Sequence, residues 1–154
     1  MSNVLARKRG ISEMEFYGTA EKLRTELSSL LFRDKATPKK YRANVTYPAL
    51  AAVNRMMTLM HRANKIFPHT PEEVKQRKEI QQECIDCLDE IYEILQYAMQ
   101  NVWWQTLHAT NSKTGEPTLD RQHLEFHLTV IGELLDREER LLTGWKRSTK
   151  LLKN

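Results

Sequence analysis

One uninterrupted stretch constrains the fold of this 154-residue chain more than any other feature. After Pro71, neither glycine nor proline occurs before Gly115. The stretch opens with Thr70, Pro71 and Glu73, which suit the cap, the first turn and the capping carboxylate of a helix. Apolar residues then recur at helical spacing: Val74, Ile80, Cys84, Cys87, Leu88, Ile91, Leu95, Ala98, Val102 and Leu107. The sequence therefore predicts one helix over residues 71–109, on the order of 55 Å long.

Three further amphipathic segments share this helical period. We expect them to form helices over residues 12–32, 48–66 and 118–151. The pattern Ser12-x-x-Glu15 suits the cap of the first of them. Four helices with short connections predict an all-α fold, an up-down-up-down four-helix bundle. Because the last two helices exceed the second in length, their ends should overhang, which favours assembly into a homo-oligomer.

The connections between these helices carry signals of their own. Pro38 suits the start of a short helical turn over residues 38–42. Pro48 restricts the residue before it and predicts a kink or break near residues 44–47. Residues 111–116, Asn-Ser-Lys-Thr-Gly-Glu, form the clearest turn in the chain.

The length of the chain fits one domain. Residues 1–11 are predicted to be a flexible basic arm, and residues 12–152 to form the bundle. No apolar segment follows the bases of the arm, so we expect no secretory signal. The longest apolar run, residues 49–53, is far short of a membrane span. We therefore expect no membrane partner. Two cysteines are too few for a disulfide scaffold, so we expect a cytoplasmic protein.

Charge is unevenly distributed along the chain. The net charge is +4, and residues 33–42 and 140–154 hold five Lys or Arg each. Residues 79–110 hold six Asp or Glu and neither Lys nor Arg. This segregation indicates a basic face for a polyanion and another face for a different partner. Solvated helix faces that pair within the bundle are an equal alternative.

Basic residues near aromatic ones are the candidate nucleic-acid contacts. Cationic side chains can hold phosphates while aromatic rings stack on unpaired nucleobases. Tyr41 and Tyr47 interleave with the Lys and Arg residues around them. The predicted contacts are Lys39, Lys40, Arg42, Arg62, Lys65, Lys146, Arg147, Lys150 and Lys153. For residues 38–42, a plain solvated turn is an equal alternative.

Four other aromatic residues are predicted to lie at an oligomer or partner interface. They are Tyr97, Trp103, Trp104 and Trp145. Packing of the tryptophans inside the bundle is the alternative.

Residue patterns that would indicate an enzyme are weak. Cys84 and Cys87 form a lone Cys-x-x-Cys within a predicted helix, which favours buried core residues over a redox or zinc site. His123 and His127 stand four residues apart, but the chain lacks the second motif that a di-iron bundle requires. Neither a glycine-rich phosphate loop nor a recognisable Ser-His-acid triad occurs. We therefore predict no catalytic residue, no metal ligand and no cofactor, and expect that the protein is not an enzyme.

Two short motifs resemble a known group of helical proteins. Pro38-Lys39-Lys40-Tyr41-Arg42, leading through Pro48 into a helix that ends Arg62-Ala63-Asn64, is similar to the Avd-like and S23 ribosomal-intervening-sequence proteins. The segment from Ile131-Gly132-Glu133 to Leu141-Leu142-Thr143-Gly144-Trp145-Lys146-Arg147 looks more like the Avd branch, the accessory variability determinant of diversity-generating retroelements. The order of helices fits over about residues 11–150.

The resemblance implies a fold and a function. Avd proteins are basic four-helix bundles that assemble as homopentameric barrels. They bind the reverse transcriptase of the retroelement and its template RNA or cDNA, and they support mutagenic retrohoming into a variable gene. A non-enzymatic accessory subunit of this kind is therefore expected here. An S23-type structural or interaction bundle without a retroelement role is the alternative.

Overall fold

The computed structural model describes residues 14–152, and within them the fold is all-helical. Its five α-helices are α3 (Glu15–Leu31), α4 (Tyr47–Asn64), α5 (Pro71–Asn101), α6 (Trp104–Leu107) and α7 (Leu119–Ser148). Apart from an isolated antiparallel bridge between Thr110 and Pro117, these residues hold no β-structure. The predicted basic arm, the Ser12 cap and Lys153 lie outside the described residues.

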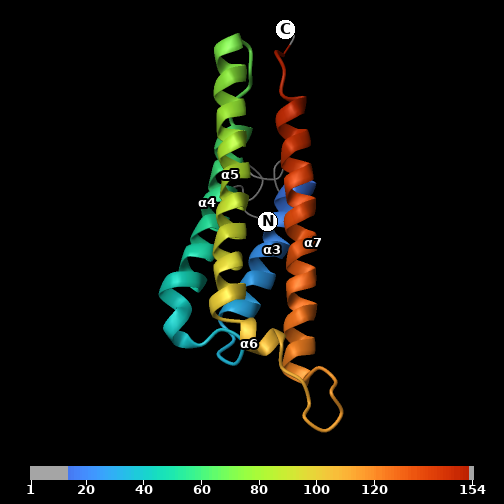
Figure 1. Ribbon diagram of the computed structural model, residues 1–154. Helices are drawn as coiled ribbons and strands as arrows, with labels where there is room; N and C mark the ends of the chain where they lie inside the picture. The colour runs from blue at the N-terminus through green and yellow to red at the C-terminus, as the bar shows by residue number, and fades with distance from the viewer. Residues whose placement is uncertain (1–13, 153–154) are drawn as a thin grey trace, which may run out of the picture.

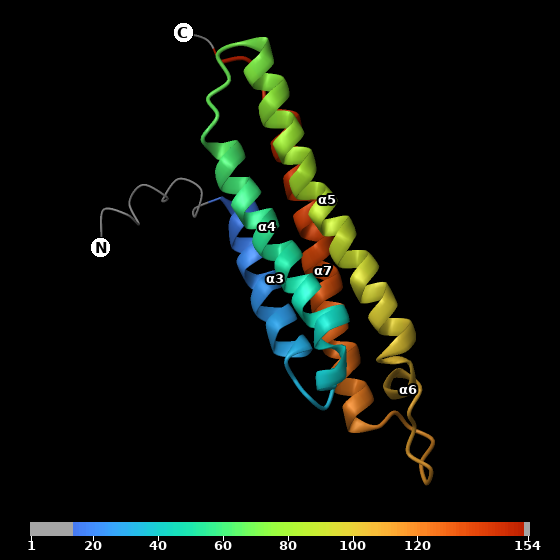
Figure 2. The same ribbon diagram turned by 90° about the vertical axis from the view of Figure 1, so that its left-hand side faces the viewer.

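Four long helices lie side by side and give the molecule an elongated shape (Figures 1 and 2). Each long helix contacts two others: α3 contacts α4 and α7, and α5 contacts α4 and α7. Helix α4 packs most extensively on α5, and α3 packs on α7. The short α6 lies at the lower end in Figure 1, beside the start of α7. None of the helices in residues 14–152 is both long enough and apolar enough to cross a membrane.

The core follows the predicted apolar stripes. Leucines of α3, methionines of α4 and branched residues of α5 and α7 fill the space between the four long helices. The largest fully buried side chains are Leu23, Leu27, Leu30, Leu31, Met56, Met60, Leu88, Ile91, Trp103, Ile131 and Leu135. At about 1.5–3 kcal/mol for each large apolar side chain, this burial is the main term that favours folding.

Threonine side chains connect the end of α3 to the next segment. The hydroxyl of Thr37 donates to the carbonyl oxygen of Leu30 at 3.2 Å, and that of Thr46 donates to Leu31 at 2.9 Å. Both threonines are buried. They therefore donate to carbonyl groups in the last turn of α3, where regular helical partners run out.

The predicted break before α4 is a change of helix type. A 3₁₀ turn over Lys39–Tyr41 is followed by a π-helical turn over Arg42–Thr46, which continues directly into α4. Pro48 has no N–H and would clash with the carbonyl of a regular preceding turn. A wide π turn relieves that clash without ending the helix.

The predicted single helix over residues 71–109 is wrong at its end. Helix α5 stops at Asn101, and α6 begins only at Trp104. The N–H groups of Val102 and Trp103 both donate to the carbonyl of Ala98, at 2.8 and 2.9 Å. This change in the hydrogen-bond pattern turns Trp103 into the core, where it is fully buried.

The other helix boundaries lie close to those predicted. Thr70 caps α5 by accepting a hydrogen bond from the N–H of Glu73. Thr118 caps α7 by accepting from the N–H of Arg121. The turn over residues 111–116 is confirmed, and it contains Gly115 with a φ of 73°, a value that glycine adopts without strain.

Candidate nucleic-acid interface

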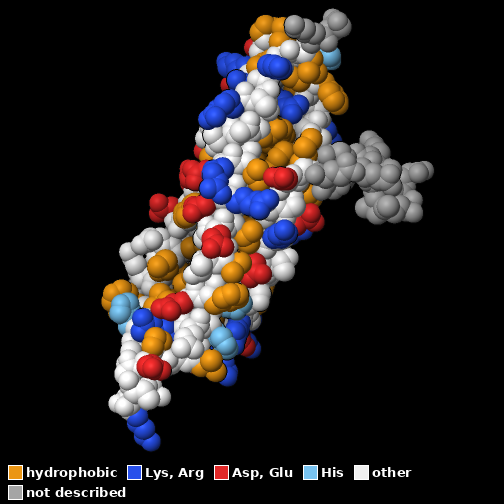
Figure 3. Space-filling view, turned by 90° about the vertical axis from the view of Figure 1, so that its right-hand side faces the viewer, with side chains coloured by type: hydrophobic (Ala, Val, Ile, Leu, Met, Phe, Trp, Pro, Cys, Tyr) orange, Lys and Arg blue, Asp and Glu red, His pale blue; other side chains and the backbone are white. Residues whose placement is uncertain are grey.

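The predicted cations divide between the two ends of the bundle. Arg62 and Lys65 end α4, and Lys146 and Arg147 lie in the last turn of α7, at the upper end in Figure 1. On the α7 side of the molecule, Lys and Arg side chains gather over this upper end, and acidic ones are more frequent below it (Figure 3). We call this region the basic end; its cations are Arg62, Lys65, Lys75, Lys78, Lys146, Arg147 and Lys150.

Two of these cations were not among the predicted contacts. Lys75 and Lys78 line an open groove between the start of α5 and the end of α7, together with Lys146. The groove has a volume of about 520 Å³. These lysines were not predicted because Glu72, Glu73 and Glu79 lie close to them in the sequence. Their spacing of three residues, which places both on one face of a helix, could have indicated them.

Helix α5 separates the cations of the basic end into two sides. Arg62 lines the groove between α4 and α5, whereas Lys146 lines the groove between α5 and α7. The ammonium group of Lys146 donates to the Gln82 side chain at 2.8 Å, so its position is fixed. Arg147 and Lys150 are exposed and form no ion pair with any residue in the range 14–152.

An aromatic contact holds the basic end together. The ring of Trp145 stacks on Phe16 with centroids 4.1 Å apart, and the guanidinium of Arg77 lies over the same indole. Arg77 also donates to the carbonyl of Ile66 at 2.8 Å, which ties down the loop after α4. Trp145, predicted at an interface with a partner, thus packs largely against residues of its own chain.

The C-terminal segment is fixed to the same region. The Thr149 hydroxyl donates to the buried side chain of Gln81 at 2.9 Å. The N–H of Leu152 donates to the carbonyl of Pro68 at 2.9 Å. These bonds hold the chain after α7 against the loop between α4 and α5, which places Lys150 at the basic end.

The other three predicted cations in the described part of the chain lie at the opposite end. Lys39 and Lys40 are exposed in the 3₁₀ turn, and the Lys40 ammonium lies over the ring of Tyr41 at 5.1 Å from its centroid. Arg42 is engaged within the chain, because it pairs with Asp34 at 2.9 Å and packs over Phe32. Helix α7 separates the two ends by about 45 Å, so the structure does not bring all predicted cations together.

The predicted interface aromatics have different environments. Trp103 is fully buried in its own chain and has no surface to offer a partner, which corrects its predicted place at an interface. Trp104 and Tyr97 are exposed, at 58% and 41%. These two side chains remain available for an intermolecular contact.

The acidic side chains of α5 are partly engaged within the chain. Arg55 of α4 pairs with Glu90, and this contact raises the pKa of the guanidinium further. Tyr92 donates a 2.7 Å hydrogen bond to Asp136 of α7; burial, followed by this bond, raises the pKa of the phenol. Pairing between helices therefore accounts for part of the charge segregation.

Glu138 is a buried carboxylate that the sequence analysis missed. It lies on the buried face of α7 with no exposed surface. Neither carboxylate oxygen has a hydrogen-bond partner in the described part of the chain. Burial raises its pKa to about 9. The signal was its position between Leu135 and Leu142, because the helical period requires a core residue there.

The two cysteines are buried core residues, as predicted. Cys84 and Cys87 are free thiols, and the Cys84 sulfur lies 3.7 Å from the carbonyl of Met56. Burial raises the pKa of Cys84 to about 12 and also raises that of Cys87. A thiol that stays protonated is a poor nucleophile and a poor metal ligand.

The histidines of α7 lie beside a small hollow rather than in a metal centre. His123 and His127 line it with Asp120, and the Nδ1 atom of His127 lies 3.8 Å from a carboxylate oxygen of Glu26. Within residues 14–152, no group of three or more His, Cys, Asp or Glu side chains is placed to hold a metal ion.

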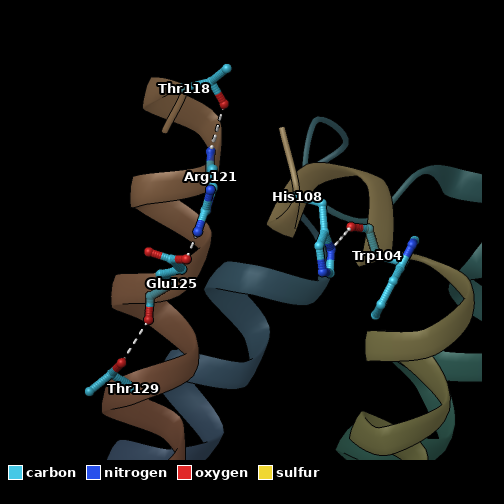
Figure 4. A network of polar contacts seen from close by, with 6 residues as sticks. All are labelled: Trp104, His108, Thr118, Arg121, Glu125 and Thr129. Carbon is cyan, nitrogen blue, oxygen red and sulfur yellow. Dashed lines mark hydrogen bonds and ion pairs between the residues drawn. The ribbon is translucent and has the colours of Figure 1, made fainter. Parts of the chain in front are cut away.

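Polar contacts also stabilise the first turns of α7 (Figure 4). Arg121 donates to the carboxylate of Glu125 at 3.0 Å, and the Thr129 hydroxyl donates to the carbonyl of Glu125 at 2.8 Å. The same view shows His108 beside Trp104 at the start of α6. These contacts occupy the side chain of Arg121, which is therefore not a free cation.

No known protein family, curated protein or solved structure matches the chain.

Proposed function

We propose that this protein is a non-enzymatic, nucleic-acid-binding accessory subunit of a diversity-generating reverse transcriptase. The supporting observation is the basic end, where cations of α5 and α7 line one groove although they are far apart in sequence, while Arg62 of α4 lines the groove on the other side of α5. Lys75, Lys78 and Lys146 line one groove there. Such a groove suits the phosphates of a nucleic acid, which supply most of the affinity in complexes of this kind.

The retroelement part of the proposal comes from the two Avd-like motifs. On this proposal, the helices form an up-down-up-down bundle that assembles into a homopentameric barrel in the cytoplasm. The ring presents several basic ends to one template RNA or cDNA, which turns weak phosphate contacts into useful avidity. Of the aromatics predicted at an interface, the exposed Tyr97 contacts the reverse transcriptase or a neighbouring subunit on this proposal.

Light scattering on the purified protein, alone and with a structured RNA at low and high salt, tests this function. The proposal predicts the mass of five subunits and RNA binding that high salt reverses. The variant K146E/R147E/K150E should keep the oligomer and lose the RNA. The exposed Lys113, in the turn before α7, provides the control K113E, which should bind as the original protein does.

The opposite results favour a different function. A monomer or dimer that does not bind RNA at low salt would refute the accessory-subunit proposal. It would support an S23-type interaction bundle, for which the pairing of Arg55 with Glu90 and of Arg42 with Asp34 is the favouring observation. In such a bundle, the segregated charges serve contacts between helices.

A further inference from the structure

A second hollow lies far from the basic end, at the corner where α5 ends and α6 begins. It has a volume of about 430 Å³, within the range of small-molecule sites. Lys40 and Tyr41 of the 3₁₀ turn line one side of it, and Gln100, Trp104 and Gln105 line the other. The break after Asn101, which the sequence did not predict, creates this juxtaposition.

The indole of Trp104 is exposed yet held in place. The ring centroid of His108 lies 3.8 Å from that of Trp104, with 35° between the planes. The Nδ1 atom of His108 lies 2.8 Å from the carbonyl oxygen of Trp104, as Figure 4 shows. Because His108 restricts the rotation of an indole that stays 58% exposed, little entropy is lost when a planar ligand stacks on it.

Amide side chains surround the indole. Gln100 and Gln105 make no side-chain hydrogen bond to any residue between 14 and 152. The Nδ2 atom of Asn101 donates to the carbonyl of Tyr97 at 3.0 Å, which leaves its amide oxygen as an acceptor. Free amides offer both donors and acceptors, the groups that pair with the edge of an unstacked nucleobase.

The electrostatics of the corner favour a base over a phosphate inside the hollow. The C-terminus of the 31-residue α5 carries partial negative charge, which disfavours an anion beside Asn101. Lys40 lines the hollow and Lys39 lies next to it, and neither forms an ion pair with a described residue. A neutral ring fits inside, while the lysines can hold the flanking phosphates.

We infer that this corner binds an unpaired base of a single-stranded nucleic acid, stacked on Trp104, with its phosphates at Lys39 and Lys40. The inference rests on the proposed function, and it assigns that function a second contact at the opposite end of the bundle. A protein partner seated on Trp104 is the competing occupant. The two occupants can be distinguished by base stacking, because an abasic strand keeps its phosphates but has no base to stack on Trp104.

The test compares two labelled 12-nucleotide probes by fluorescence anisotropy at one salt concentration. One probe is oligouridylate, and the other is an abasic oligomer with the same ribose-phosphate backbone. The original protein should prefer oligouridylate by roughly 5- to 150-fold, the usual contribution of one stacked base. W104A should abolish this preference and leave the affinity for the abasic probe unchanged, whereas W104F should retain most of it.

Phe126 provides the matched control, because it is an exposed aromatic on α7 that does not line the hollow. F126A should keep the preference of the original protein. The inference is overturned if W104A also keeps that preference, or if it loses affinity for both probes equally. It is likewise overturned if W104A binds as the original protein does but has a different mass by light scattering, which would make Trp104 a protein contact.

Failure of the two proposals is distinguishable. K146E/R147E/K150E should weaken binding of both probes while the ratio between them stays constant. A constant ratio in W104A with weaker binding in the triple variant would refute only the corner site. If the original protein binds neither probe at low salt, the proposed function fails, and the corner site fails with it.

Discussion

The guanidinium of Arg77 lies over the indole of Trp145, with its Cζ atom 5.6 Å from the ring centroid. The contact joins the start of α5 to the end of α7, and Phe16 of α3 covers Trp145 as well. Burial lowers the pKa of Arg77. A planar cation that also donates to the loop after α4 is thus a structural part of the basic end.

Replacing Arg77 with lysine should weaken this end although the charge is kept. An ammonium cannot both lie flat on Trp145 and reach the carbonyl of Ile66. We expect a loss of about 1–2 kcal/mol in the free energy of unfolding, measured by urea denaturation. Q76K, at an exposed neighbouring position, is the control and should change stability little. A variant as stable as the original would contradict the assigned role.

Glu138 should make the stability of the fold depend on pH. Its pKa is about 9 in the folded protein and about 4.5 when unfolded, so the folded state favours the protonated form. Its contribution is therefore complete below pH 4.5 and is lost as the pH rises toward 9. At pH 7, the free energy of unfolding is lower by roughly 3 kcal/mol than below pH 4.5 as a result of this difference in pKa.

E138M should accordingly be more stable than the original protein at pH 8, because methionine fills the space without a charge. Denaturation at a series of pH values between 4.5 and 9 measures the effect. The exposed Glu133 on the same helix gives the control E133Q, which should leave the pH dependence unchanged. Identical pH profiles for E138M and the original protein would show that Glu138 is not buried in solution.

Trp103 should be sensitive to its size and not to its N–H group. The side chain is fully buried, and its indole nitrogen has no hydrogen-bond partner in residues 14–152. W103A should cost about 3–5 kcal/mol through the cavity that it leaves. W103F removes an unpaired donor and keeps most of the volume, so it should cost much less. Equal losses in thermal denaturation would mean that the nitrogen has a partner.

The thiols should be unreactive until the protein unfolds. Cys84 and Cys87 are buried, and burial raises the pKa of each. At pH 8, a colourless disulfide reagent that releases a chromophore should react with neither thiol in the native protein. Both should react at once in guanidinium chloride. Rapid labelling of the native protein would show that α5 opens locally.

Exposed cations of the basic end should set the salt dependence of RNA binding. Removing Arg147 and Lys150 together should reduce the slope of log affinity against log salt by about 1.4, or about 0.7 for each lost phosphate contact. The measurement is a titration of single-stranded RNA at four salt concentrations. K113A, in the distant turn, should leave the slope unchanged.

The sequence predicted helices well where local chemistry decides the structure. Thr70 caps α5 as its neighbours indicated, and Gly115 takes the turn conformation that glycine permits. The end of α5 was missed because burial of Trp103 depends on the whole bundle. No local pattern reports that tertiary effect.

Interior positions were predicted less completely than helix boundaries. The buried residues of α4 include Ala49, Ala52 and Ala63, whose small side chains give little sign of burial in the sequence. Phe67 is apolar but 63% exposed, since α4 ends before it. For the candidate site, the sequence supplied the cations but not their separation into two ends, which depends on helix direction.

That separation makes the bundle a molecular ruler. Helix α7, about 45 Å long, spans the bundle from the end that holds the corner to the end that holds the groove at Lys146. A stacked strand that rises 3.4 Å per nucleotide covers this distance in about 13 nucleotides. A stacked oligonucleotide below that length can occupy one end only, so the number of turns in α7 sets the minimum length of a stacked strand that engages both ends.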